Sequence, residues 1–282
     1  RYAIETLPPL LMAASRWIVP GIAFISWARI RGSAPAPTAE HWKTTAIVGV
    51  FLLVGGNGIV SWAEQWVPSG WAALLIATVP LWMALLQWAI ARQRGRSHSL
   101  APLAAFGIAL GFAGVAILLA ASGKMSGISN EGFDSRSITG SFMLILAALL
   151  WAIGSLYSRE ASLPSSPILA TGMQMLCGGI ALLILGSLTG EWSRVELSQV
   201  SARSFLALLY LMSFGSVLGF TAYVWLLRVS SPEKVATYAY VNPVVAVFLG
   251  WIAGGEPVTS GVLAASAVIV GSVVLITSAR KT

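Results

Sequence analysis

Charged residues, histidine and cysteine are all scarce in this sequence. Only 10% of its 282 residues are charged, 57% are hydrophobic, and the mean hydropathy is +0.81. A soluble protein of this length needs more polar surface than this composition provides, so the chain is predicted to be an integral membrane protein. Cys177 is the sole cysteine, which excludes a disulfide within the chain. We expect this thiol to be a small buried residue.

Acidic residues and histidines are absent from the interior of the long apolar runs. All ten Asp and Glu residues fall in predicted loops or at span ends, and His41 and His98 fall in predicted connections. Proton relays usually need carboxylates or histidines inside the membrane, so a passive carrier is favoured over a proton-coupled pump. The sequence has no GxxxxGK[ST] phosphate loop and no cluster of His, Asp or Cys, so we expect no ATP hydrolysis, enzyme activity, cofactor or metal.

Lysine and arginine exceed the acidic residues and give a formal net charge of +7. They lie in short gaps between apolar runs, where they set membrane topology, so nucleic acid is not an expected partner. The lipid bilayer and a small molecule are the expected partners. The side with more cations is predicted to be cytoplasmic, and it carries the C-terminus. That side holds Arg29, Arg31, Lys43, Arg92, Arg94, Arg96, Arg159, Arg228, Lys234, Arg280 and Lys281.

Nine apolar runs are long enough to cross the membrane as helices, which need about 20 residues each. The connections between them are short, and none is large enough for a soluble domain. The fold is therefore predicted to be an all-α bundle. The runs cover about 8–29, 43–62, 69–91, 101–121, 139–158, 167–187, 204–227, 233–252 and 258–278.

Two of these runs read as copies of each other and carry a proline near the middle. PSGWAALLIATVPLWMALLQW (68–88) aligns with SPEKVATYAYVNPVVAVFLGW (231–251) when Pro80 is set on Pro243. A proline inside a helix frees the carbonyl four residues earlier, here that of Ile76 or Ala239. Each run is therefore predicted to be a kinked or discontinuous helix, and paired broken helices of this kind mark a substrate path near the bilayer midplane.

The repeat extends to the neighbouring runs and predicts two inverted halves. Matching runs are five spans apart, and because five is odd the two halves insert in opposite senses. We predict repeats at 1–121 and 139–278, joined by a loop at 122–138. RYAIETLPPLLMA (1–13) resembles SLYSREASLPSSPILA (155–170), so residue 1 looks like the tail of an earlier span. The native protein is thus expected to have ten helices in a 5+5 arrangement, with a cytoplasmic N-terminus.

Polar residues inside the second run form one candidate wall of a transport path. Asn57, Ser61 and Glu64 fall at i, i+4 and i+7, on one face of a helix. The alternative is that these groups form hydrogen bonds between helices. The preceding Gly55 and Gly56, with Gly58, would give the helix room to bend.

Arg16 is the one cation clearly inside a predicted span. Charged residues at that depth are functional candidates by default. The structural alternatives are that its side chain extends outward to the interface or pairs with Glu64, and we favour a structural role.

Other candidate substrate-binding residues flank the two prolines or lie at mid-span depth. Trp82 and Trp151 are too deep for an interfacial belt, so they are candidates for stacking against an aromatic or apolar ligand, although each also suits core packing. The remaining candidates are Thr78, Gln174, Tyr238 and Asn242, with Pro80 and Pro243 as helix-breaking or gating positions.

Three segments carry a resemblance to a known family. GGNGIVSWAEQWVPSGWAALLIATVPLWMALL, LLWAIGSLYSR and ATYAYVNPVVAVFLGWIAGGEPVT resemble the EamA-type branch of the drug/metabolite transporter superfamily, close to its bacterial amino-acid exporters. The resemblance covers essentially the whole chain. It implies ten helices, residence in the bacterial inner membrane, and export of amino acids or small metabolites through a central cavity by alternating access.

The favoured hypothesis is an exporter of amino acids with broad specificity, including aromatic and apolar ones, that works without an obvious proton relay. We expect it to function as a monomer, with a dimer as the alternative. A multidrug or other small-metabolite exporter, with possible proton coupling, is the second hypothesis. Anionic sugar nucleotides are disfavoured because the interior supplies only Arg16. A scaffold is disfavoured because it needs no paired broken helices.

Overall fold

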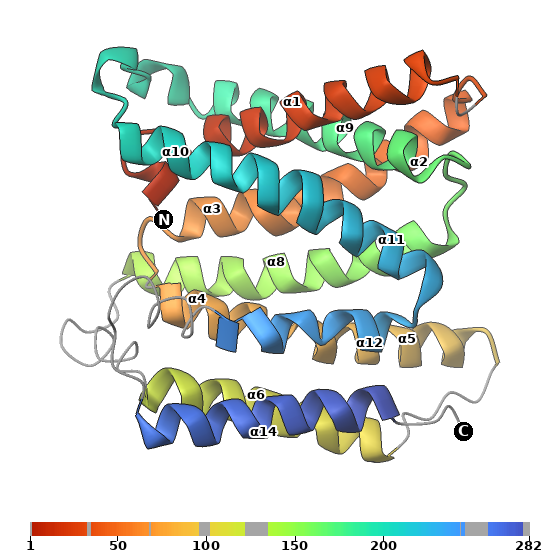
Figure 1. Ribbon diagram of the computed structural model, residues 1–282, viewed down its shortest axis with the longest axis vertical. Coiled ribbons are helices and arrows are strands. Elements are labelled where there is room, and N and C mark those ends of the chain that lie inside the picture. Colours follow the sequence, from red (N-terminus) through yellow and green to blue (C-terminus); the bar gives the residue numbers. More distant parts are fainter. Residues whose placement is uncertain are drawn as a thin grey trace. The chain divides into compact units, whose positions relative to one another are not determined.

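The described part of the protein consists of helices and short connections, without a strand. The computed structural model describes residues 2–32, 35–67, 69–95, 102–121, 135–242, 244–245 and 259–278. Six of its helical segments are long and apolar enough to cross a membrane. The prediction of an all-α membrane protein is therefore confirmed (Figure 1).

The helices begin and end close to the predicted limits. The second and seventh spans are continuous, but each contains a π-helical segment, η2 or η5, between α-helical ends. The elements are η1 (Tyr2–Ile4), α1 (Pro9–Ile30), α2 (Ala39–Gly49), η2 (Val50–Gly58), α3 (Ile59–Ala63), α4 (Ser69–Ile76), α5 (Val79–Gln93), α6 (Pro102–Ala121), α8 (Ser135–Glu160), α9 (Pro167–Leu188), η3 (Glu191–Arg194), η4 (Leu197–Gln199), α10 (Ala202–Tyr210), η5 (Leu211–Phe220), α11 (Thr221–Val229), α12 (Pro232–Ala236) and α14 (Ser260–Ser278).

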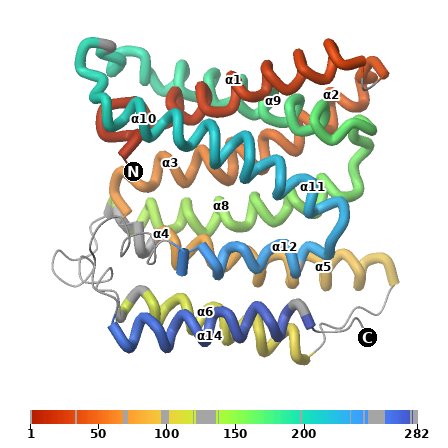
Figure 2. Tube along the Cα trace, viewed as in Figure 1, coloured from red at the N-terminus to blue at the C-terminus, as the bar shows by residue number. Residues whose placement is uncertain are grey.

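The chain forms two compact units, and each contains segments from both predicted repeats. Unit 1 comprises Arg1–Gln65 and Ile153–Ser230, and unit 2 comprises Trp66–Ala152 and Ser231–Thr282. Each unit is therefore formed by helices that are far apart in the sequence. The colours in Figure 2, which follow the residue number, show which parts of the chain come together.

In unit 1, α1 and α9 lie side by side and pack through glycines (Figure 1). Gly172, Gly179 and Gly186 on α9 are seven residues apart and so share one face of the helix. A Cβ atom on Gly179 would lie 2.7 Å from Ile18 Cγ1, and one on Gly172 would lie 2.8 Å from Phe24 Cβ. Because these glycines lack a side chain, the two backbones approach closely, as membrane helices do at small residues. Cys177, on the same helix, is a free thiol and is half-buried rather than fully buried as predicted.

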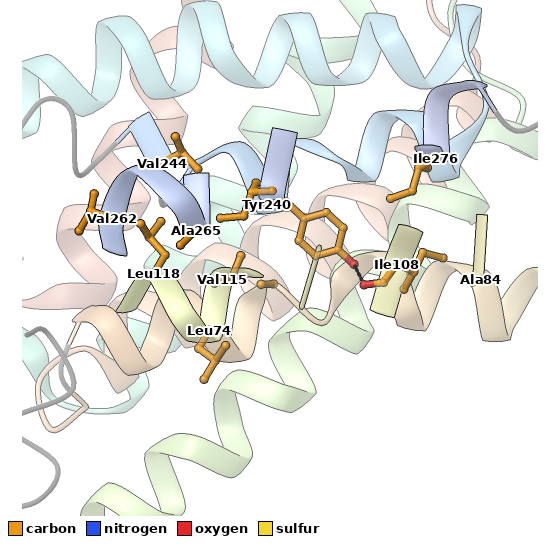
Figure 3. Packing of buried hydrophobic residues seen from close by; sticks show 12 residues of the cluster. Leu74, Ala84, Ile108, Val115, Leu118, Tyr240, Val244, Val262, Ala265 and Ile276 are labelled. Atoms are coloured by element: carbon orange, nitrogen blue, oxygen red, sulfur yellow. Dashed lines mark hydrogen bonds between the residues drawn. The ribbon is translucent and has the colours of Figure 1, made fainter. Parts of the chain in front are cut away.

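In unit 2, α6 and α14 pair in the same way, and Tyr240 covers the contact. Gly111 on α6 faces Tyr240 and Ser272, and Gly107 faces Ile276. The fully buried Tyr240 donates its hydroxyl hydrogen to the carbonyl of Ile108 at 3.2 Å (Figure 3). This hydrogen bond satisfies the phenol inside an apolar cluster, so Tyr240 anchors the segment that follows α12 onto α6.

We expect Gly111→Ala to destabilise the protein and Gly271→Ala to leave its stability unchanged or slightly raised. A Cβ atom at Gly111 would lie 2.8 Å from both Ser272 Oγ and the Tyr240 ring, whereas one at Gly271 meets no described atom within 4 Å. Such overpacking costs about 1–3 kcal/mol, while alanine in an uncrowded helix is slightly favourable. Thermal unfolding midpoints of the two variants in detergent check this expectation. Equal midpoints would contradict it.

Candidate transport site

The predicted break at Pro80 is present. Helix α4 ends at Ile76, and α5 begins at Val79 with Pro80 in its first turn. Proline is well suited to that position because the first turn of a helix leaves its N–H groups unpaired. The Thr78 hydroxyl donates to the carbonyl of Leu75 at 2.6 Å. The side chain of Thr78 thus stabilises the interruption from within the same chain segment.

A second interruption lies in the partner segment, but earlier than predicted. Helix α12 ends at Ala236, Thr237 forms a turn, and residues 238–242 are helical again. The expected position was the carbonyl of Ala239, and Pro243 itself lies outside the described residues. The Thr237 hydroxyl donates to the carbonyl of Lys234 at 2.7 Å. A threonine hydroxyl offers the backbone an alternative to helical bonding, so the interruption is located at Thr237. Sequence reasoning missed this residue.

The π-helical segments η2 and η5 occupy corresponding positions in the two predicted repeats. The shift of 163 positions that sets Pro80 on Pro243 also sets Phe51 on Phe214, Gly56 on Gly219 and Trp62 on Trp225. The predicted bending residues of the second run, Gly55, Gly56 and Gly58, all lie in η2, whereas η5 was not predicted. Wide π turns are frequent at functional sites in helices.

Unit 1 contains three of the predicted substrate-binding residues. Asn57 lies in η2 and is half-buried, and Ser61 is buried in α3. Gln174 is fully buried on α9, which packs against η2. Neither the nitrogen nor the oxygen of the Gln174 amide has a hydrogen-bond partner within the part of the chain that the structure describes. Buried amides normally have partners, so this side chain can accept and donate to a further group.

Arg16 links α1 to the second π-helical segment. Its Nε atom donates to Ser216 Oγ on η5 at 3.0 Å, and its Cζ atom lies 4.6 Å from the centroid of the Trp17 ring. Glu64 directly follows α3, which packs against α1. Pairing of Arg16 with Glu64 stays a prediction.

A buried hydrogen bond joins α8 to α11 within unit 1. The hydroxyls of Ser155 and Tyr223 lie 2.6 Å apart, and both side chains are buried. The sequence does not predict this contact, because it joins residues that are 68 positions apart in the chain.

In unit 2, the two candidate tryptophans border one apolar cluster. Trp82 and Trp151 are partly buried and pack against a set of fully buried side chains. The Trp82 indole N–H is buried without a hydrogen-bond acceptor among the described residues. This arrangement suits both core packing and stacking against an apolar ligand. The cluster consists of Val79, Met83, Ala148, Ala152 and Ala236.

The remaining candidates in unit 2 differ in exposure. Tyr238 is half-buried, and Asn242, one turn further along, is exposed. Within the described ranges, no three His, Cys, Asp or Glu side chains lie together where they would hold a metal ion. The candidate residues offer a ligand amides, hydroxyls and indole N–H groups, and Arg16 and Glu64 carry charges.

Comparisons with known proteins identify a family model and several relatives that match most of the chain. The model of the EamA-like transporter family matches residues 1–120 and 138–278. The chain is 37% identical over 279 residues to the uncharacterized inner membrane transporter YedA of Escherichia coli (strain K12), covering 98% of this chain and 84% of the relative. It is 26% identical over 282 residues to the uncharacterized transporter YvbV of Bacillus subtilis (strain 168), covering 99% and 86%.

The fold is also similar to that of a protein of known crystal structure. That structure superposes with a TM-score of 0.73 at 19% sequence identity and covers 98% of this chain and 90% of the other. At this low identity the structural match shows only that the folds are similar. The matches to the family model and to YedA are matches of the sequence itself. The chain therefore belongs to the EamA-like transporter family.

Proposed function

We propose that this protein exports amino acids across the bacterial inner membrane by alternating access, with broad specificity that includes aromatic and apolar side chains. Its family supports transport, and the name of YedA supports the inner membrane. The resemblance to amino-acid exporters supports the substrate. The C-terminus would lie in the cytoplasm.

The observation that carries the proposal is the pair of helix interruptions at Thr78 and Thr237. Each occurs in a span that the proline repeat had singled out, and each is closed by a threonine hydroxyl bonded to the carbonyl three residues earlier. Interrupted helices in the matching spans of two repeats are typical of secondary transporters, in which they allow local bending around a substrate. The π-helical segments η2 and η5 add a second pair of irregular turns.

The proposed substrate-binding residues supply polar groups and aromatic surface. In unit 1, Asn57 and the Gln174 amide, which has no partner among the described residues, would bond to polar groups of a substrate. In unit 2, Trp82 and Trp151 would contact an aromatic or apolar side chain. The full set is Asn57, Ser61, Thr78, Trp82, Trp151, Gln174, Tyr238 and Asn242, with bending at Gly55, Gly56, Gly58, Pro80 and Pro243.

Uptake of labelled phenylalanine, threonine and methionine into liposomes containing the full-length protein tests the proposal. We expect uptake down the substrate gradient that is indifferent to an imposed pH gradient, because the described spans place no carboxylate or histidine in mid-membrane. Uptake that follows the pH gradient would instead support a proton-coupled exporter. Absence of uptake of every amino acid would contradict amino-acid transport and favour another metabolite or a drug.

Replacement of Gln174 should lower the rate of transport without lowering the thermal stability of the protein. In Gln174→Leu the two unpaired buried polar atoms are removed, so the thermal midpoint should stay equal or rise. The initial rate of uptake should fall at the same time, because the substrate loses a hydrogen-bonding group. Met175→Leu, at an equally buried neighbour on α9, is the matched control and should change neither quantity. Unchanged uptake by Gln174→Leu would remove Gln174 from the site.

Replacement of Trp82 should discriminate between substrates. We expect Trp82→Phe to weaken phenylalanine uptake about 2- to 10-fold and threonine uptake less, because an aromatic contact contributes about 0.5–1.5 kcal/mol. Trp88→Phe on the same helix is the control, since Trp88 is exposed and stacks with Arg92. Equal effects of Trp82→Phe on both amino acids would indicate packing rather than recognition.

A further inference from the structure

Arg16 lies within a membrane-spanning helix, and its guanidinium uses one of its N–H groups in a side-chain hydrogen bond, from Nε to Ser216. It lies seven residues after Pro9, the start of α1, which places it about 10 Å along the helix. The terminal nitrogens donate to none of the described residues. Donors without acceptors are costly at this depth, so the terminal N–H groups are expected to bind a further acceptor.

The segment η5 is shaped to leave room for this guanidinium. A Cβ atom on Gly215 would lie only 2.8 Å from Arg16 Nη2. Any other residue at position 215 would therefore displace the guanidinium. With Nε fixed on Ser216, the terminal N–H groups form a planar fork, which matches the two oxygens of a carboxylate.

The opposite charge is supplied by Glu64. This residue directly follows α3, the helix that carries Ser61, and α3 packs against α1, the helix that carries Arg16. Ser216 and Gly215 lie in one π-helical segment, and Glu64 follows the other by one short helix. The segment η5 therefore lies next to Arg16, and the segment η2 leads through α3 to Glu64.

We propose that Arg16, Ser216 and Glu64 form a binding site for the zwitterionic backbone of an α-amino acid. Arg16 and Ser216 bind the α-carboxylate, and Glu64 binds the α-ammonium group. The inference rests on the proposed function and adds the groups that recognise the substrate class. A pair with no net charge suits a zwitterion, because an amine or a carboxylic acid alone leaves one protein charge without a partner.

The test measures uptake of labelled phenylalanine by the full-length protein in liposomes. Three unlabelled inhibitors are compared: phenylalanine, phenethylamine, which lacks the carboxylate, and 3-phenylpropionate, which lacks the ammonium group. The wild-type protein should bind phenylalanine at least about 10-fold better than either analogue. Arg16→Gln should raise the KM for phenylalanine about 10- to 100-fold and abolish the preference over phenethylamine. Glu64→Gln should abolish the preference over 3-phenylpropionate.

Two further variants separate recognition from folding. Gly215→Ala keeps both charges but displaces the guanidinium, so it should also lose the preference over phenethylamine while its thermal midpoint remains near that of the wild type. Arg31→Gln removes an exposed cation just after the same helix and should preserve both preferences.

The outcomes distinguish the inference from the function on which it rests. Wild-type preferences in Arg16→Gln, Glu64→Gln and Gly215→Ala, with phenylalanine still transported, would overturn the zwitterion site alone. Loss of uptake in Arg16→Gln together with normal preferences in Gly215→Ala would also overturn it, because the arginine would then be structural. A wild-type protein that transports no amino acid would overturn both.

Discussion

Pairing of backbone groups in hydrocarbon is the constraint on which the rest of this structure depends. Without water, each N–H and C=O group needs a partner inside the protein, so the spans are helical. The chain departs from a regular α-helix where a nearby hydroxyl or a wider turn offers the backbone other hydrogen bonds. At Thr78 and Thr237 a hydroxyl bonds to the carbonyl three residues earlier, and in η2 and η5 the backbone adopts wider turns. These departures are the features that relate the fold to transport.

Close helix packing is the second element of the architecture, and glycine makes it possible. Lipid chains are as apolar as leucine, so burial of apolar surface does little to hold membrane helices together. The pairs α1 with α9 and α6 with α14 instead depend on backbone approach at glycines. These pairs are long and regular, whereas the irregular segments lie in other spans. Regular paired helices and helices with irregular turns therefore coexist within each unit.

Charge is used sparingly, which gives Arg16 and Glu64 their significance. The described spans also contain hydroxyl, amide and indole groups, several of which have partners, as Ser155 has in Tyr223. The Gln174 amide and the Trp82 indole N–H have none among the described residues. Unpaired polar groups in an apolar interior lower stability, so their presence is more easily understood as a requirement of binding than of folding.

The sequence by itself determined the membrane class, the limits of the spans and the break at Pro80, because span length, apolar composition and proline act locally. The glycines at 55, 56 and 58, predicted to let the helix bend, lie in the π-helical segment η2. The tertiary structure decided which distant groups meet: Arg16 with Ser216, Ser155 with Tyr223, and the glycine faces of α9 with α1. It also located the second interruption at Thr237 and revealed η5. A contact between residues 200 positions apart has no local pattern, since it depends on how whole helices pack, and only the folded chain specifies that packing.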